Sequence, residues 1–155
     1  MDRVPSSLFV GPYLRVHEAI YRGTRGFVGK RLAGPPTLLL TTTGRKTGRM
    51  RTNALIYYRD GAAWVVVASN GGSDHAPGWL ANLRAEPQVG VQSGRRKYRA
   101  VARVADAAER ARLWPLVNRN NRGMARLFHR RVQGRYDVYQ QSTAREIAVV
   151  VIEPL

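Results

Sequence analysis

The 155-residue chain contains no cysteine, and this absence removes a whole group of possible chemistries. Disulfide bonds, thiolate nucleophiles and cysteine-based metal sites are excluded. Histidine is scarce as well, because His17, His75 and His129 are the only three, and they lie far apart without the paired spacing typical of metal ligands. The sequence therefore predicts neither a metal centre nor cysteine-based catalysis.

Long apolar runs are also missing. The longest, at residues 62–68, is far below the ~20 residues that a membrane-spanning helix needs. The first 12 residues also lack the apolar centre of a signal peptide. Because 44% of the residues are hydrophobic and no linker or repeat divides the chain, we expect one folded domain over residues 1–155. We expect this domain in the cytoplasm, either free or associated with the inner face of the cell membrane.

Acidic residues are the third deficit, with 10 Asp and Glu against 26 Lys and Arg and a net charge of +16. A surface of one sign attracts polyanions, which leaves nucleic acid, anionic lipid or an acidic small molecule as candidate partners. The densest cluster lies in the stretch TTTGRKTGRMRT, residues 41–52, and consists of Arg45, Lys46, Arg49 and Arg51. Two glycines, at positions 44 and 48, bracket the turn in this stretch. They predict a close approach of backbone amides and cationic side chains to an oxyanion.

Alternating and β-branched patterns predict about six strands, mostly joined as antiparallel hairpins. These are residues 37–43, 52–59, 63–69, 88–92, 96–104 and 145–154. Helical patterns occur at residues 12–23, Pro77–Ala85 and after Asp106, which forms a plausible capping pair with Glu109. We therefore predict an α+β fold: a helix and glycine-rich loop over residues 1–35, then an antiparallel barrel with helical insertions over residues 36–155.

Two further basic clusters lie at residues 95–99 and 119–135. A charge run of this kind is most often a solvated face. The second cluster shares its stretch with apolar residues at helical spacing, so it could be a lid over a pocket, a simple packing element or a contact with an anionic membrane. Residues 13–21 form a second amphipathic segment that could meet a membrane.

Several segments in order resemble the deazaflavin-dependent nitroreductase family of actinobacteria. They are LLLTTTGRKTGRMRTNALIYY, WVVVASNGG, PGWLANLRAEPQVGVQ and YDVYQQSTAREIAVVVIEP, and the resemblance covers Ala19 to Pro154. It implies a split β-barrel that binds the 8-hydroxy-5-deazaflavin coenzyme F-420. The phospholactyl oligoglutamate tail of this coenzyme carries several negative charges, which would complement the positive charges of the cluster at residues 45–51.

The resemblance also implies roles for individual residues. Lys46 and Arg51 match positions that grip the phosphate and tail, supported by Arg45, Thr47 and Arg49. The ring-contacting region matches Asn53, Ala54, Leu55, Ala68, Ser69 and Asn70. At position 70 the family frequently has lysine, so Asn70 removes one cation near the coenzyme.

The acceptor end of the site is implied in the same way. Tyr136 and Tyr139, three residues apart, match tyrosines that shape the acceptor pocket, and a phenol or the Ser69 hydroxyl can hydrogen-bond an oxygen that gains negative charge. Without the resemblance, the tyrosines could equally pack on the barrel and Ser69 could bond its own backbone. Trp79 matches a tryptophan at the edge of the site, although an aromatic residue on a short helix is more often part of the core.

The implied function is an oxidoreductase that transfers a hydride from reduced F-420 to a planar electron-poor acceptor. A quinone is the expected acceptor, and nitroaromatics are expected as adventitious substrates. The phosphate-binding turn alone also fits a flavin mononucleotide-binding split-barrel oxidoreductase. A coenzyme carrier without turnover and a basic nucleic-acid-binding domain are further alternatives, but the sequence has no nucleic-acid-reading motif and we expect no specific nucleic-acid partner.

Overall fold

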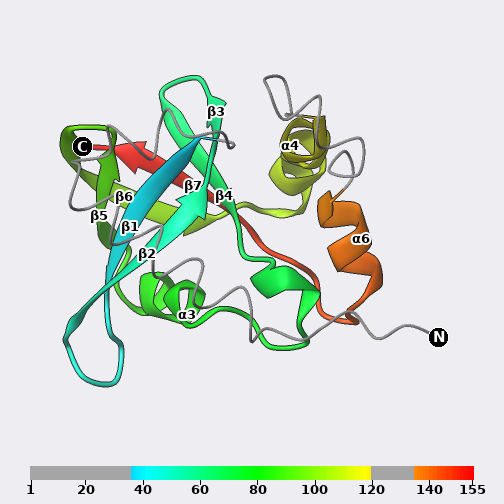
Figure 1. Ribbon diagram of the computed structural model, residues 1–155, viewed down its shortest axis with the longest axis horizontal. Coiled ribbons are helices and arrows are strands. Elements are labelled where there is room, and N and C mark those ends of the chain that lie inside the picture. The colour runs from blue at the N-terminus through cyan, green and yellow to red at the C-terminus, as the bar shows by residue number, and fades with distance from the viewer. Residues whose placement is uncertain (1–35, 120–134) are drawn as a thin grey trace.

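The computed structural model describes residues 36–119 and 135–155 (Figure 1). The predicted N-terminal helix and glycine-rich loop lie outside the described residues, and so does nearly all of the basic segment at 119–135. In the described part, no helix is long and apolar enough to cross a membrane, and no group of histidine and acidic side chains could hold a metal ion.

The described residues form one seven-stranded antiparallel sheet with three α-helices and a short 3₁₀ helix, η1. The strand order is β2-β1-β5-β6-β7-β4-β3. The elements are β1 (Thr37–Thr43), β2 (Met50–Ile56), β3 (Tyr58–Asp60), β4 (Ala63–Val67), η1 (Asn70–Gly72), α3 (Gly78–Ala85), β5 (Gln88–Ser93), β6 (Arg96–Val104), α4 (Ala107–Arg119), α6 (Arg135–Gln141) and β7 (Val149–Pro154).

The strand predicted at 52–59 is in fact divided between β2 and β3, so the count of about six is one too low. The two strands follow each other with only Tyr57 between them, yet β2 is one edge of the sheet and β3 is the other. The Tyr57 amide donates to the Pro36 carbonyl at 3.0 Å, which extends the β1–β2 pairing by one residue before the chain crosses to β3. Because one residue joins the two edges, the sheet must curl until they approach each other. The predicted split β-barrel of the α+β class is confirmed.

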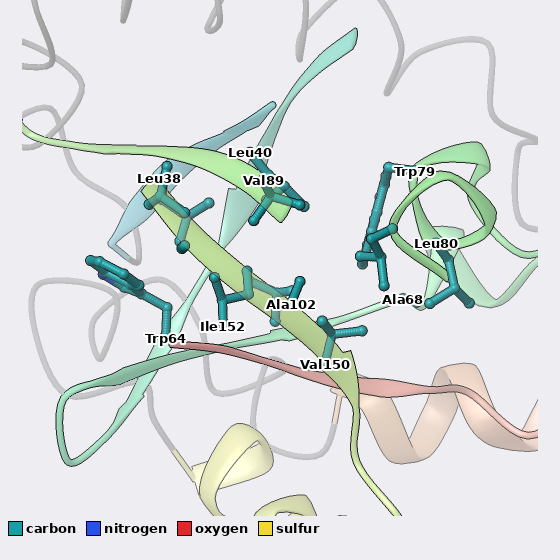
Figure 2. Packing of buried hydrophobic residues seen from close by; sticks show 14 of the residues in the cluster. Leu38, Leu40, Trp64, Ala68, Trp79, Leu80, Val89, Ala102, Val150 and Ile152 are labelled. Carbon is teal, nitrogen blue, oxygen red and sulfur yellow. The ribbon is translucent and has the colours of Figure 1, made fainter. Parts of the chain in front are cut away.

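The core consists of two apolar clusters: an inner cluster with residues of β1, β4, β5, β6, β7 and α3, and an outer cluster with residues of β3, β4, β7, α4 and α6. Strands β4 and β7 contribute to both clusters, because side chains alternate between the faces of a sheet. On β4, Trp64 and Val66 belong to the inner cluster, whereas Val65 and Val67 belong to the outer cluster. Helix α3 packs on the inner cluster through Trp79, Leu80 and Leu83, and Figure 2 shows several of these inner side chains converging. Helices α4 and α6 pack on the outer cluster through Leu113, Val117 and Tyr136.

Helix α4 begins as the sequence predicts. The Asp106 carboxylate accepts a hydrogen bond from the Glu109 amide at 2.8 Å, which caps the first turn. The Glu109 carboxylate does not reach back to the cap but binds Arg103 of β6, and this hydrogen bond lowers the pKa of Glu109. Arg112 binds both carboxylate oxygens of Asp60, at 3.0 and 2.7 Å, and lowers the pKa of Asp60. These contacts tie α4 to β3 and β6.

Candidate functional site

The turn between β1 and β2 is closed by its own backbone. The Gly48 amide donates to the Gly44 carbonyl at 2.7 Å, and the Gly44 amide donates to the Arg49 carbonyl at 2.8 Å. Gly48 has a φ of +68°, which favours glycine. A Cβ atom on Gly44 would lie only 2.9 Å from the Arg49 carbonyl oxygen. Both glycines are therefore needed for this compact turn.

Five amides of the turn, those of Gly44, Arg45, Thr47, Gly48 and Arg49, already donate to groups of the protein. The Thr47 amide donates to the Gly44 carbonyl at 3.3 Å and the Arg49 amide donates to the Thr47 hydroxyl at 3.3 Å. The Arg45 amide donates to the Asn82 side-chain carbonyl at 3.2 Å. The prediction that the turn offers its backbone to an anion is therefore wrong for these groups. An anion at this turn would therefore be held mainly by side chains.

The cationic side chains of the turn are suited to that task. Arg45, Lys46, Arg49 and Arg51 are all exposed. Within residues 36–119 and 135–155, none of the four forms an ion pair with an acidic side chain, whereas Arg103 and Arg112 both do. The turn is consequently a fixed, one-sign surface available to an external anion.

Helix α3 anchors this surface through Asn82, a residue that sequence reasoning missed. Asn82 is 7% exposed. Its side-chain carbonyl accepts from the Arg45 amide and from Arg45 Nη1, at 3.2 and 3.4 Å, and its amide donates to the Thr42 hydroxyl at 3.2 Å. One buried amide thus fixes both the strand end and the first cation of the turn relative to α3.

The register of β1 and β2 divides the predicted ring-contacting residues between the two faces. Three residues of β2 stand directly opposite residues of β1: Arg51 opposite Thr42, Asn53 opposite Leu40 and Leu55 opposite Leu38. Directly opposite residues share a face, and Leu38 and Leu40 belong to the inner cluster. The three β2 residues therefore form a row on the inner face, beside α3. Ala54 stands opposite Leu39 and projects from the other face, so only its backbone is available to a ligand on the inner side.

The second group of predicted residues lies where β4 leads into η1. Ala68 is fully buried in the inner cluster, so its side chain is a core residue. Ser69 is half-buried and Asn70 is exposed. Asn70 has a φ of +45°, which is uncommon for a residue other than glycine, and its side chain donates to the His75 carbonyl at 2.8 Å. Ser69 and Asn70 are thus at the surface end of this segment.

The aromatic candidates differ in their surroundings. Trp79 is 5% exposed and packs in the inner cluster, as the core interpretation predicts. Tyr136 and Tyr139 share one face of α6, with ring centroids 6.2 Å apart. Tyr136 is 6% exposed and meets Tyr58 edge-on in the outer cluster. Tyr139 is only half-buried and is therefore the more accessible of the two phenols.

These elements follow one another across the molecule. Figure 1 shows the β1–β2 turn at the lower left, α3 to its right and α6 at the right. Asn82 joins the turn to α3, and η1 contacts α6. The cationic residues therefore lie at one end of this series of elements, and Ser69 and Tyr139 lie at the other. A ligand that contacts both ends would place its anionic groups at the turn.

The family model for "F420H(2)-dependent quinone reductase" matches residues 13–154. The chain belongs to the F420H(2)-dependent quinone reductase family. An F420H(2)-dependent quinone reductase of Mycobacterium tuberculosis (strain H37Rv) is 45% identical over 142 residues, which are 90% of this chain and 88% of the relative.

Solved structures agree with this family. An F420-H2 dependent reductase, FDR-A, is 32% identical with a TM-score of 0.61, over 76% of this chain and 94% of that one. A second solved structure, described only as a domain-swapped dimer, is 28% identical with a TM-score of 0.64, over 95% of this chain and all of that one.

Membership of the F420H(2)-dependent quinone reductase family makes this protein an oxidoreductase and F-420 its coenzyme. The residues present fit that coenzyme. The exposed cations of the β1–β2 turn suit a tail with one phosphate and several carboxylates, since hydrogen bonds between ionised groups are about twice as strong as neutral ones. Family membership thus identifies the coenzyme as a deazaflavin and not flavin mononucleotide, a distinction that the turn alone does not make.

Proposed function

We propose that this protein reduces quinones by holding the tail of F-420 on the β1–β2 turn and the ring along β2 toward Ser69. One observation carries this arrangement: the exposed cations of the turn have no acidic partner within the described residues, while Asn82 fixes the turn to α3. Lys46 and Arg51 are the main tail ligands in this proposal. Arg45, Thr47 and Arg49 support them.

Asn53 and Leu55 would receive the ring. They share the inner face with Arg51, so one row of β2 leads from a cationic side chain to a polar one and then to an apolar one. A flat ring with a polar edge is bound by a surface that is mostly apolar and has a few polar groups at fixed positions, as this row provides. The backbone of Ala54 and the side chain of Asn70 would border the ring, whereas the buried side chains of Ala68 and Trp79 would support the slot from the core.

Reduced F-420 supplies the hydride when it is bound. The protein needs no nucleophile of its own, because its task is to hold the acceptor against the coenzyme and to stabilise the oxygen that gains charge. Ser69 and Tyr139 are the proposed hydroxyl donors for that oxygen. Tyr136 lies deeper, in the outer cluster, so we propose that it orients Tyr139 through the contact between their rings.

We propose quinones as the physiological acceptors and nitroaromatics as adventitious ones. Lipophilic quinones reside in membranes, so this function fits a cytoplasmic protein that associates reversibly with the inner face of the cell membrane. The segments expected to meet lipid, residues 13–21 and 119–135, lie almost entirely outside the described residues. We also propose that residues 1–155 act as one domain.

Anaerobic oxidation of reduced F-420 by a short-chain quinone tests this function. The expected result is catalysed coenzyme oxidation that saturates with quinone. Reduced flavin mononucleotide, supplied at the same concentration, is expected to give no catalysed reaction. Activity with the flavin alone would refute the proposal, and tight F-420 binding without any turnover would support a carrier instead.

A further inference from the structure

Arg145 makes an unusual set of contacts just before β7. Its guanidinium donates to three backbone carbonyls of the segment between β4 and α3: Nη1 to Ala68 at 3.2 Å, Nη2 to Ser69 at 2.8 Å and Nε to Ser73 at 2.8 Å. All three nitrogens of one side chain therefore hold the loop that presents Ser69 and Asn70.

Two neighbours of Arg145 hold the same loop. The Ser142 hydroxyl lies 3.0 Å from the Gly72 carbonyl and 2.8 Å from the Tyr139 carbonyl, between which its one hydrogen is shared. The Thr143 hydroxyl donates to the Asp74 carboxylate at 2.8 Å. Gly72 itself lies against α6, because a Cβ atom placed on it would be 3.1 Å from the Tyr139 Cα. Residues 142–145 thus fix the Ser69 loop and the Tyr139 helix to each other.

The three contacts fix the loop on both sides of Asn70. Asn70 has a φ of +45°, a conformation that asparagine adopts more readily than most residues, and Arg145 binds the carbonyls of Ser69 before it and Ser73 after it. The guanidinium is a planar fork whose donors have a fixed geometry, so it can set the direction of several carbonyls at once. A lysine ammonium also has three donors, but they share one nitrogen on a flexible stem and cannot match the spacing of Nε, Nη1 and Nη2.

We infer that Arg145 is a positioning residue for hydride transfer: it sets the Ser69 hydroxyl and Tyr139 in the relative arrangement that the acceptor needs. This inference rests on the proposed function, because it assumes that the acceptor meets Ser69 and Tyr139. Arg145 acts through the loop and does not touch the reacting atoms. The β1–β2 turn contacts the second half of α3 through Asn82, whereas Arg145 holds the loop that precedes α3. We therefore expect the affinity of the turn for the F-420 tail to be independent of Arg145.

Arg145→Lys is the main test variant, since it keeps the charge and removes the fork; Arg145→Ala is the second. Arg110→Lys is the matched control. Arg110 is also half-buried and also donates to a backbone carbonyl, that of Ile147 at 2.9 Å. It binds α6 through the Gln140 side chain at 3.0 Å but does not contact the Ser69 loop, so it controls for a lost arginine fork away from that loop.

Two measurements separate the outcomes. With reduced F-420 and a quinone, Arg145→Lys is expected to lower kcat at least roughly tenfold while the Kd for F-420 changes less than about twofold, because small misplacements of positioned groups are costly in rate. In coenzyme-free protein, amide hydrogen exchange at residues 69–73 is expected to accelerate in both Arg145 variants and to stay unchanged in Arg110→Lys.

The inference is overturned if Arg145→Lys keeps its kcat within about twofold of the parent protein. It is also overturned if kcat and F-420 affinity fall together and equally in Arg145→Lys and Arg110→Lys, since that pattern reports general destabilisation. A parent protein that binds F-420 but reduces no quinone would instead refute the proposed function. The hydrogen-exchange result would then still decide whether Arg145 holds the loop.

Discussion

Replacing Lys46 and Arg51 together by alanine is expected to weaken F-420 binding without unfolding the protein. Both side chains are exposed, and neither has an ion-pair partner in the part of the chain that the structure describes. The turn itself is held by the backbone bonds of Gly44 and Gly48 and by Asn82, none of which involves the two deleted side chains. The folded structure should therefore survive the change.

The size of the effect follows from that exposure. Two unit charges 4 Å apart interact by about 1 kcal/mol in a water-like medium. Losing two such contacts costs about 2 kcal/mol, which corresponds to a roughly 30-fold higher Kd. Salt should shrink the difference, because the screening length falls from about 10 Å at 0.1 M to about 3 Å at 1 M ionic strength.

Fluorescence titration of F-420 at these two ionic strengths measures the effect, with coenzyme preparations that carry different numbers of glutamates. The matched control is Lys97→Ala with Arg99→Ala on β6, which removes the same charge from exposed positions of the same sheet. The control should keep nearly the parent affinity. Equal losses in both double variants would refute a specific tail site and leave only a general attraction to the +16 charge.

Three further predictions concern the supports of the site and the stability of the fold. Asn82→Ala should lower the free energy of unfolding, measured in urea, by about 1–3 kcal/mol, because the buried groups that bind Asn82 lose their partner. It should also weaken F-420 binding, because Arg45 is no longer held, and an unchanged affinity would exclude the anchoring role. Tyr139→Phe should lower kcat with the quinone while the Kd for F-420 barely moves, and equal losses of both would contradict an acceptor-side role. Asp60→Asn should lower stability at pH 7, because Arg112 lowers the pKa of Asp60 and the carboxylate therefore stabilises the fold above its unfolded pKa. That difference should fade as the pH falls below about 4 and the carboxyl becomes protonated, so a urea midpoint difference that is the same at pH 7 and pH 3 would contradict the ion pair.

Local sequence patterns predicted the elements that depend on neighbouring residues. The glycines at 44 and 48 marked the β1–β2 turn, and Asp106 marked the start of α4. The spacing of Tyr136 and Tyr139 placed both on one face of a helix. Each of these features is set within a few residues, so a short window of sequence contains the information.

Long-range contacts could not be read in the same way. The residues 52–59 form an unbroken β-favouring run, and nothing in them signals that the chain leaves one edge of the sheet and joins the other at Tyr57. Asn82 binds a residue 37 positions away, and Arg145 binds carbonyls 72 to 77 positions away. A polar residue in a short helix and an arginine before a strand are ordinary surface positions by pattern alone. Only the fold shows that they hold the two ends of the site.

A crystal structure of the protein with F-420 bound tests the central claim most directly. We expect the phosphate and carboxylates of the tail to contact the side chains of Lys46 and Arg51, with the ring lying along β2 toward Ser69. A tail bound elsewhere, for example on the basic residues of β6, with the β1–β2 turn free in solvent, would contradict it.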